Sequence, residues 1–405
     1  MPKPLPLLRS GHELRLLQGA TEFFPAIIGA IDAAQSEVRL GTYIFDFQGG
    51  GAEVAYALER AARRGVSVKV LVDGFGTPPL PLVWEERFLE AGVDWRVYSP
   101  LGWLGVLWLG SWRRLHRKLC LIDGRIGFCG GINVLDDLYD QAGPTALAPR
   151  FDFSVQITGP LVEQIAATMQ RQWKRNQAVR DIRGARLKGA LQSLRGSGRA
   201  LAPPAARPAT EGQGARATLV LRDNLRNRDR IERAYLRAIG RSREEVLIAN
   251  AYFVPGRRMR HALVEAARRG VKVTLLLQGR YESFMQFYAA RSVYGVLLRA
   301  GVEIHEYSSS FLHAKVAVID GHWATVGSSN LDPLSLLLAR EANIVVEDVP
   351  FATALRGKLM DAIAKEGSAV DPQSYTNRPV SNRFLEWVAL SATRLAVLVQ
   401  GKKYL

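Results

Sequence analysis

The stretch RRLHRKLCLIDGRIGFCGGIN, residues 113–133, occurs a second time in altered form as FLHAKVAVIDGHWATVGSSN at residues 311–330. Both copies follow the pattern H-x-K-x4-D-x7-[G/S]-x-N. The pattern residues are His116, Lys118, Asp123, Gly131 and Asn133 in the first copy, and His313, Lys315, Asp320, Ser328 and Asn330 in the second. This recurrence predicts a fold organised around two equivalent units.

Each copy has the signature of a β-hairpin. An apolar run, 119–122 or 316–319, ends in Asp-Gly and is followed by a second apolar run, which is typical of a hairpin with a two-residue turn. In this register His116 lies across from Gly131, and His313 lies across from Ser328. Since alternate residues of a strand share a face with directly opposed residues, we expect the His, Lys, Gly or Ser and Asn of each copy to converge. The two Asp residues are expected to hold the turns.

The converging side chains favour an anionic ligand. Each face combines imidazole, ammonium and carboxamide groups, and the second adds a hydroxyl, without a carboxylate. Lysine supplies a point charge, Asn and Ser supply directional donors, and His can attack phosphorus or transfer a proton. A single His and Lys in a strand could be a structural histidine beside an exposed lysine. Their recurrence in both copies favours a phosphate site.

The repeat extends beyond the motifs. AARRGVSVKVLVDG at 61–74 returns as AARRGVKVTLLLQG at 266–279, and AGVDWRVYS at 91–99 returns as AGVEIHEYS at 300–308. Helical and strand patterns alternate, with a helix from Thr21, a strand at 37–47, a helix at 52–64 and a strand at 66–72. The sequence therefore predicts a layered α/β fold made by internal duplication. Two like halves can pack about a pseudo-twofold axis and share one phosphate site between His116 and His313.

Composition limits the partners. The chain has 405 residues, 48% of them hydrophobic, and a formal net charge of +16. Such a basic chain indicates an anionic partner, either nucleic acid or an acidic membrane surface. Its two cysteines, Cys120 and Cys129, indicate core thiols in a reducing compartment. The first twenty residues lack a signal-peptide pattern, which makes export unexpected, and no metal-ligand cluster is apparent.

The twin H-x-K-x4-D motif resembles the phospholipase D superfamily. RRLHRKLCLIDG, GGIN, FDFSVQITGPLV and GSSNLDPLSLLLAREANIVV are similar to bacterial cardiolipin synthases, closest to their B-type branch, and the resemblance runs from about residue 12 to about 350. It implies two phospholipase D-like α/β/α sandwich halves that share one active site and need no cofactor. The expected organisation is a first half at 1–183, a basic Arg/Gly/Pro linker at 184–215, a second half at 216–370 and a membrane-associating segment at 371–405.

The resemblance also implies a reaction: a phosphatidyl group passes from one phosphatidylglycerol to another through a phosphohistidine, forming cardiolipin and glycerol. His116 is then the nucleophile and His313 the acid and base. Phosphate oxygens are held by Lys118, Lys315, Asn133, Asn330 and Ser328, while Asp123 and Asp320 complete the catalytic motif and Asp152 and Glu341 orient the histidines. A phospholipase D-type hydrolase and a nuclease of the superfamily remain alternatives. A non-catalytic membrane-docking protein would not need two intact motifs.

Two further stretches suggest lipid contact. LGWLGVLWLG at 101–110 is too short to span a bilayer, and is either a core strand or a loop that dips into lipid beside the site. RFLEWVALSATRLAVLVQGKKYL at 383–405 is either a helix lying in the membrane surface or one packed on the domain. We expect anionic phospholipids as partners without obligatory nucleic acid, and a peripheral location on the cytoplasmic face of the bacterial cell membrane.

Overall fold

The computed structural model describes residues 4–100, 114–138, 148–183, 214–223, 227–281, 284–332 and 339–399. The apolar stretch at 101–110 lies outside these ranges, as does nearly all of the expected linker at 184–215.

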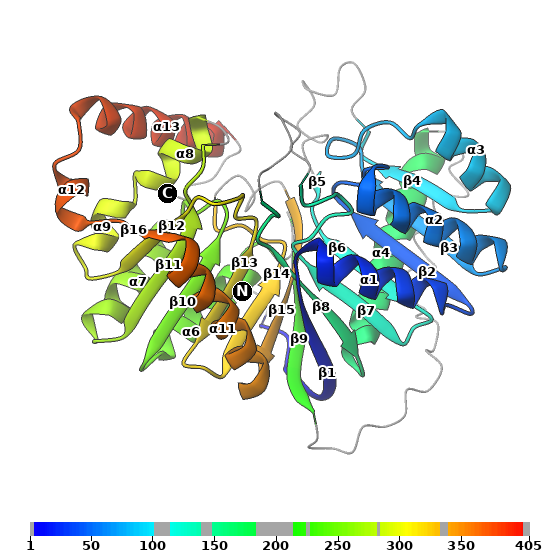
Figure 1. Cartoon of the computed structure of the whole chain (residues 1–405), viewed down its shortest axis with the longest axis horizontal. Coiled ribbons are helices and arrows are strands. Elements are labelled where there is room, and N and C mark those ends of the chain that lie inside the picture. Colours follow the sequence, from blue (N-terminus) through cyan, green and yellow to red (C-terminus); the bar gives the residue numbers. More distant parts are fainter. Residues whose placement is uncertain are drawn as a thin grey trace.

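One continuous sheet runs through both halves, and helices cover its faces (Figure 1). The first half contributes β1 (Arg9–Gln18), β2 (Glu37–Thr42), β3 (Ser67–Asp73), β4 (Asp94–Tyr98), β5 (Arg114–Leu115), β6 (Lys118–Ile122), β7 (Ile126–Gly130) and β8 (Phe153–Thr158). The second half contributes β9 (Ala215–Arg222), β10 (Glu245–Asn250), β11 (Lys272–Gln278), β12 (Glu303–Tyr307), β13 (Lys315–Ile319), β14 (Trp323–Gly327), β15 (Ala339–Glu347) and β16 (Gly367–Ala369).

The helices of the described ranges follow the same duplication. The first half has α1 (Gly19–Asp32), α2 (Gly49–Arg63), α3 (Leu82–Ala91) and α4 (Leu161–Arg183). The second has α6 (Arg230–Arg241), α7 (Arg257–Arg268), α8 (Phe284–Arg291), α9 (Tyr294–Leu298), α11 (Val349–Glu366), α12 (Pro372–Thr376) and α13 (Val380–Val399). In the two copies of the AARRG repeat, α2 and α7 end before Gly65 and Gly270, whose φ angles of 88° and 87° suit glycine at a helix end.

The strand order shows the symmetry directly. It reads β1-β8-β7-β6-β2-β3-β4 in the first half and β9-β15-β14-β13-β10-β11-β12 in the second. The halves join where β1 pairs antiparallel with β9, with Arg9 opposite Ala217 and His12 opposite Ala215. The expected α/β fold with two duplicated halves is therefore confirmed, and the two sheets are fused at the seam into one.

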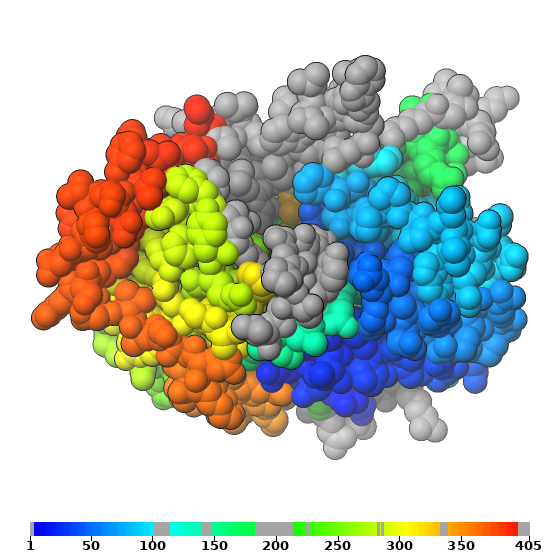
Figure 2. All heavy atoms as spheres, turned by 45° about the horizontal axis from the view of Figure 1, so that its top comes forward, coloured from blue at the N-terminus to red at the C-terminus, as the bar shows by residue number. Residues whose placement is uncertain are grey.

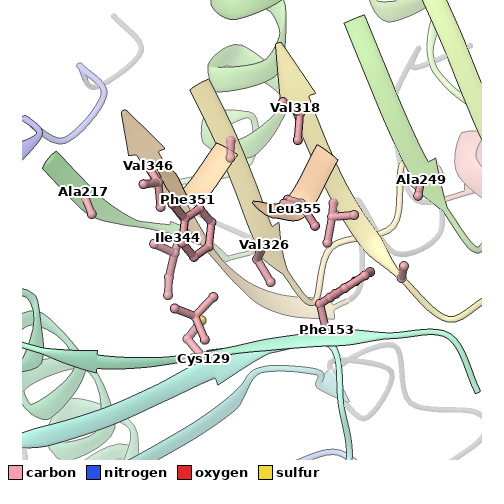
Figure 3. Close-up of a cluster of buried hydrophobic side chains, with 14 of the residues drawn as sticks. Cys129, Phe153, Ala217, Ala249, Val318, Val326, Ile344, Val346, Phe351 and Leu355 are labelled. Carbon is pink, nitrogen blue, oxygen red and sulfur yellow. The ribbon is translucent and has the colours of Figure 1, made fainter. Parts of the chain in front are cut away.

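Three large hydrophobic cores hold the described part of the fold. One lies at the seam and draws on both halves, from Cys129 and Phe153 on one side to Val326, Ile344 and Phe351 on the other (Figure 3). The other two lie within single halves, under α1, α2 and α3 in the first and under α6, α7 and α9 in the second. Because apolar burial contributes roughly 25 cal/mol per Å², the shared seam core ties the stability of each half to the docking of the other.

The hairpin register differs from the expected one by one residue. Lys118 lies opposite Gly130, not opposite Cys129, and Ile122 pairs with Ile126, so the turn has three residues. The second hairpin behaves alike, because Ile319 pairs with Trp323. The prediction of two-residue turns, with His116 across from Gly131 and His313 across from Ser328, was therefore wrong.

The turn aspartates account for the longer loop. Asp123 and Asp320 have φ angles of 50° and 49°, a left-handed conformation that Asp tolerates better than most residues. The Asp123 carboxylate accepts hydrogen bonds from the backbone N–H groups of Gln35, Ser36 and Glu37, at 2.8–2.9 Å. Asp320 accepts three such bonds from residues 243–245, each at 2.9 Å. The carboxylates thus tie each turn to the start of the neighbouring antiparallel strand, β2 for the first hairpin and β10 for the second.

Between residues 371 and 399 the chain forms α12 and α13, and α13 packs on α8. Among the described residues, no helix has the length and apolar character that crossing a bilayer requires.

Candidate active site

The backbone just before each motif histidine pairs with a segment of the opposite half. β5 pairs parallel with the start of β15, and the His116 N–H donates to the Arg340 carbonyl at 3.1 Å. An isolated parallel bridge joins Leu312 to Phe151 in the same way, and the His313 N–H donates to the Phe151 carbonyl at 2.9 Å. Each histidine is therefore held beside the residue that follows its partner carbonyl, which is Glu341 or Asp152.

The carboxylates consequently cross between the halves. His116 Nδ1 lies 3.0 Å from Glu341 Oε2, and His313 Nδ1 lies 2.5 Å from Asp152 Oδ2. Both carboxylates are buried, whereas the imidazoles keep 15% and 22% of their side-chain surface exposed. A carboxyl group on Nδ1 holds the orientation of the imidazole, and its protonation state decides which tautomer is present, so each Nε2 is left available for chemistry.

A second pair of side chains anchors the residues just before the histidines. Asp73, the last residue of β3, accepts a hydrogen bond from the Leu115 N–H at 2.7 Å. Gln278, the last residue of β11, accepts one from the Leu312 N–H at 3.2 Å. These positioning residues were missed at the sequence level, although they occupy the same place in the AARRG repeat, as the Asp of VLVDG and the Gln of LLLQG.

The two motif lysines lie beside the histidines. Lys118 Nζ donates to the His116 carbonyl at 3.1 Å, and Lys315 Nζ donates to the His313 carbonyl. Both lysines are buried. Burial lowers the pKa of Lys118 to about 7, and the positive charge of Lys315 acts in the same direction. A bound anion would oppose that shift and favour the charged ammonium.

Ser328 contacts a carboxylate rather than open space. Its hydroxyl has no exposed surface and donates to Glu341 Oε2 at 2.5 Å. The first half has Gly131 at this motif position, where a Cβ would lie 2.3 Å from Asp152 Oδ1. Glu341 therefore has a hydroxyl partner that Asp152 lacks, and the expectation that Ser328 binds phosphate does not follow from its position.

The two pairs differ in their proton affinity. Burial lowers the pKa of His116; it would also raise the pKa of Glu341, but His116, Lys118 and Arg222 outweigh it and bring that pKa below its ordinary value. Burial raises the pKa of Asp152 to about 7 and, together with Lys315 and Lys118, holds the pKa of His313 well below its ordinary value. The Glu341 carboxyl thus ionises more readily than usual beside His116, whereas the raised pKa of the Asp152 carboxyl lets the second pair bind a proton near neutral pH.

The motif asparagines are buried. Asn133 Oδ1 accepts a hydrogen bond from the Ile44 N–H at 3.2 Å, which ties the segment after the first hairpin to the segment after β2. Asn330 Oδ1 is buried, and among the described residues no hydrogen bond to it is found.

The motif aspartates lie away from the histidines. Asp123 and Asp320 are at the turns that follow β6 and β13, whereas His116 and His313 precede the first residues of those strands. The structure thus brings His116, Lys118, His313 and Lys315 together with Asp152, Glu341 and Ser328, and leaves the two turn aspartates outside. Within the described ranges, no group of three His, Cys, Asp or Glu side chains is arranged to hold a metal ion.

Two residues near the site could not be found by comparing the two copies of the repeat. The Tyr43 ring centroid is 4.9 Å from that of His116, and Lys118 Nζ lies 5.4 Å from the same tyrosine ring. Arg117 is buried and donates from Nε to the Glu341 carbonyl at 3.0 Å and from Nη2 to the Arg222 carbonyl at 2.9 Å. Tyr43 follows the C-terminal end of β2, a location where sites in α/β sheets gather. This location at the end of a strand was the sequence feature from which Tyr43 could have been predicted.

Comparison with known proteins identifies the family of the chain. The family model described as "Cardiolipin synthase, PLD-like domain" matches residues 27–142 and 235–361. Cardiolipin synthase B from Escherichia coli strain K12 is 39% identical over 373 residues, covering 90% of this chain and 83% of that protein. Cardiolipin synthase A from Erwinia tasmaniensis is 28% identical over 381 residues, covering 93% and 74%.

Solved structures share the fold. The phosphatidylserine synthase of Haemophilus influenzae Rd KW20 superposes with a TM-score of 0.69 at 13% identity, covering 97% of this chain and 96% of that one. The polyphosphate kinase of Porphyromonas gingivalis superposes with a TM-score of 0.56 at 13% identity over 94% of this chain and 53% of that one. At such identities the likeness concerns the fold alone.

Proposed function

The chain belongs to the family of cardiolipin synthases with a phospholipase D-like domain, and from this premise we propose that it transfers a phosphatidyl group from one phosphatidylglycerol to a glycerol hydroxyl of another. The products are cardiolipin and glycerol. The observation that carries the proposal is the crossed pairing of His116 with Glu341 and of His313 with Asp152. It holds two imidazoles, with different proton affinities, next to two lysines.

In the first step, Nε2 of His116 attacks the phosphorus of the donor. The ionised Glu341 holds the proton on Nδ1 and stabilises the positive charge that develops on the ring. The bond to the departing glycerol breaks as Nε2–H of His313 protonates its oxygen. Asp152 passes its own proton to Nδ1 of His313 at the same time. The result is a phosphatidyl group on His116, a neutral His313 with a free Nε2, and an ionised Asp152.

In the second step, these transfers run in reverse on a new alcohol. His313 Nε2 takes the proton of a glycerol hydroxyl on the second phosphatidylglycerol, and Asp152 recovers its proton from Nδ1. The hydroxyl oxygen attacks phosphorus, and the bond to His116 Nε2 breaks. Splitting one displacement into two lowers the barrier of each, and the free enzyme is restored without a net change in protons.

The lysines serve the phosphate itself. Lys118 and Lys315 offer their ammonium groups to the non-bridging oxygens, where charge increases during each displacement. Asn133 and Asn330 close the same two motif copies and are assigned the same oxygens, although the amide oxygen of Asn133 already accepts a hydrogen bond from the Ile44 N–H. Asp123 and Asp320 act through the hairpin turns, and Ser328 acts through Glu341.

The substrates define the location. Phosphatidylglycerol and cardiolipin are anionic lipids of a membrane, and a chain with a net charge of +16 is attracted to such a surface. We assign the protein a peripheral place on the cytoplasmic face of the bacterial cell membrane, without an obligatory nucleic acid partner.

The test is lipid mass spectrometry after incubation of purified protein with phosphatidylglycerol vesicles. The parent should form cardiolipin, and His116→Ala and His313→Ala should not. His322→Ala is the matched control, because His322 is an exposed histidine in the second hairpin turn; it should keep full activity. A covalent phosphatidyl adduct should be detected on His116 of the parent.

Other outcomes identify the alternatives. Phosphatidic acid without cardiolipin would show a hydrolase, in which water replaces the acceptor hydroxyl. An unchanged lipid profile would refute the lipid reaction and direct attention to a nucleic acid backbone, which can be tested with labelled single- and double-stranded DNA.

A further inference from the structure

Helix α13 carries an exposed apolar face. Val380, Phe384, Trp387 and Leu395 are 77%, 61%, 63% and 63% exposed. Their spacing places them on one side of the helix. The rings of Phe384 and Trp387 are stacked with centroids 6.2 Å apart. Large aromatic side chains in such a position lose favourable burial when they face water.

The opposite face of α13 is already used for packing. Ala389 is fully buried and forms a small cluster with Val254 and Ala289, the latter on α8. Glu386 is buried too and pairs with Arg378 at 2.7 Å. The helix is therefore docked on the second half by one side. The sequence suggested that this segment either packs on the domain or lies on a membrane. One face of α13 packs on the domain, and the other face is open for a partner.

The docked helix lies at the end of the molecule that holds the histidines. α8 follows β11, whose last residue Gln278 contacts the residue before His313. Tyr281, just beyond it, is 60% exposed. Figure 1 shows α13 above α8 along the upper edge of the second half.

The first half contributes a matching rim. β3 ends at Asp73, which contacts the residue before His116, and Phe75 follows with 64% of its surface exposed. Leu82 and Val83 at the start of α3 are 76% and 66% exposed. Figure 2, where this end comes forward, shows α3 in cyan on the right and the C-terminal helices in red on the left. Apolar side chains thus flank the site on both sides.

We propose that this rim, formed by Phe75, Leu82, Val83, Tyr281 and the face of α13, is the docking surface for an anionic lipid bilayer. The inference rests on the proposed function, because it orients the site toward the phosphodiester of a membrane lipid. A helix lying in a membrane interface buries its apolar face about 5–10 Å deep, which brings the flanking rim residues to the headgroup level.

Charge distinguishes a bilayer from a second copy of the chain. Arg383 and Arg394 are exposed along one edge of the apolar face of α13, where they can contact lipid phosphates. In a self-associated pair the same arginines would approach one another, and two molecules of charge +16 would repel. An anionic surface satisfies both the apolar and the basic parts of the rim.

Vesicle sedimentation of the full chain tests the proposal. The Phe384→Ser/Trp387→Ser double variant should bind phosphatidylglycerol-containing vesicles at least about tenfold more weakly than the parent. The matched control is Leu7→Ser/Val349→Ser. Leu7 and Val349 are 85% and 59% exposed, and both lie near the far ends of the strands, Leu7 beside Asp320 and Val349 just after β15. The control should bind as the parent does, and all three proteins should have the same thermal midpoint.

A second measurement separates binding from catalysis. On short-chain phosphatidylglycerol below its critical micelle concentration, the Phe384/Trp387 variant should match the parent, while on vesicles its turnover should fall with its binding. Equal vesicle binding by variant and parent would overturn the inference, as would a changed oligomeric mass with unchanged vesicle binding, which would identify a second copy as the occupant. If no protein forms cardiolipin but the variant still loses vesicle binding, the proposed function fails and the docking surface stands.

Discussion

Substitution of Ser328 by alanine tests whether the hydroxyl sets the proton affinity of the His116–Glu341 pair. Ser328 Oγ donates a 2.5 Å hydrogen bond to Glu341 Oε2, the same oxygen that contacts His116. A hydrogen bond to a charged group contributes about 1.5–3 kcal/mol. Because a tenfold change in proton affinity corresponds to about 1.36 kcal/mol, its loss should raise the proton affinity of the pair roughly ten- to a hundredfold.

The consequence is a displaced pH profile. His116 attacks only as a neutral imidazole, and in the parent burial keeps its pKa below the ordinary value. Without the hydroxyl, the carboxylate attracts the imidazolium more strongly, so the nucleophile is lost at a higher pH. The acid limb of kcat should move upward by about one to two pH units, and at a pH well below the limb the rate should be about ten- to a hundredfold lower than that of the parent. Above the limb, kcat should remain near that of the parent.

The assay is cardiolipin formation in mixed micelles from pH 5 to pH 9, with kcat and KM determined at each pH. Ser329→Ala is a matched control, because Ser329 is equally buried but, among the described residues, its hydroxyl bonds only to the Asn330 carbonyl, at 3.4 Å. An acid limb for Ser328→Ala that coincides with those of the parent and of Ser329→Ala would refute the reasoning. A loss of kcat by the same factor at every pH would assign Ser328 a different role.

Three further predictions concern the same framework. Gly131→Ser should reduce kcat by about a hundredfold or more, because its Cβ would lie 2.3 Å from the Asp152 carboxylate and displace it from His313; unchanged turnover with a normal thermal midpoint would contradict this. Asp123→Ala should lower the free energy of unfolding in urea by about 2 kcal/mol while the folded enzyme keeps its kcat, because the carboxylate holds a turn; a selective loss of kcat would instead restore it to the catalytic set. The pKa of Lys118 is lowered to about 7, so its positive charge is lost as pH rises through that value and KM for phosphatidylglycerol should increase above pH 7. The Lys118→Met variant should have a high KM at every pH. An identical KM profile in the parent and the variant would refute the assignment.

The recurrence of one motif was enough to predict the duplicated α/β fold, because a repeated unit can bury its apolar face against its copy. It could not predict the crossed pairing of carboxylates. Asp152 and Glu341 occupy equivalent repeat positions, and spacing along the chain is the same whether each serves its own half or the other. The choice is made by long-range docking, which pairs β5 with β15 and Leu312 with Phe151.

The predicted length of the hairpin turns was wrong for a different reason. Asp-Gly between apolar runs favours a two-residue turn, but that rule considers the hairpin alone. In the folded protein the Asp123 carboxylate binds three backbone N–H groups of the segment that leads into β2. This contact takes Asp123 and Gly124 together into the left-handed region and adds Arg125 to the loop. A tertiary contact thus outweighed the local turn preference.

Departures from symmetry are the least predictable and carry much of the chemistry. Arg117 and Tyr43 have no counterpart that the repeat would identify, and each contacts the His116 side of the site. Asp73 and Gln278 could have been found, because they are the polar ends of repeated apolar strands.

The crossed arrangement makes the halves interdependent for catalysis as well as for folding. A half alone would keep its histidine and lysine, but it would lose the carboxylate on Nδ1 and the carbonyl that holds the histidine N–H. The interface between the two halves also buries the seam core, so the contacts that stabilise the fold also assemble the site. Duplication alone would produce two identical pairs with equal proton affinity. The pairs differ in their surroundings, because Glu341 has the Ser328 hydroxyl as a partner while Gly131 stands at the matching position beside Asp152. A reaction that needs one imidazole neutral and one able to give up a proton can use such an inequality.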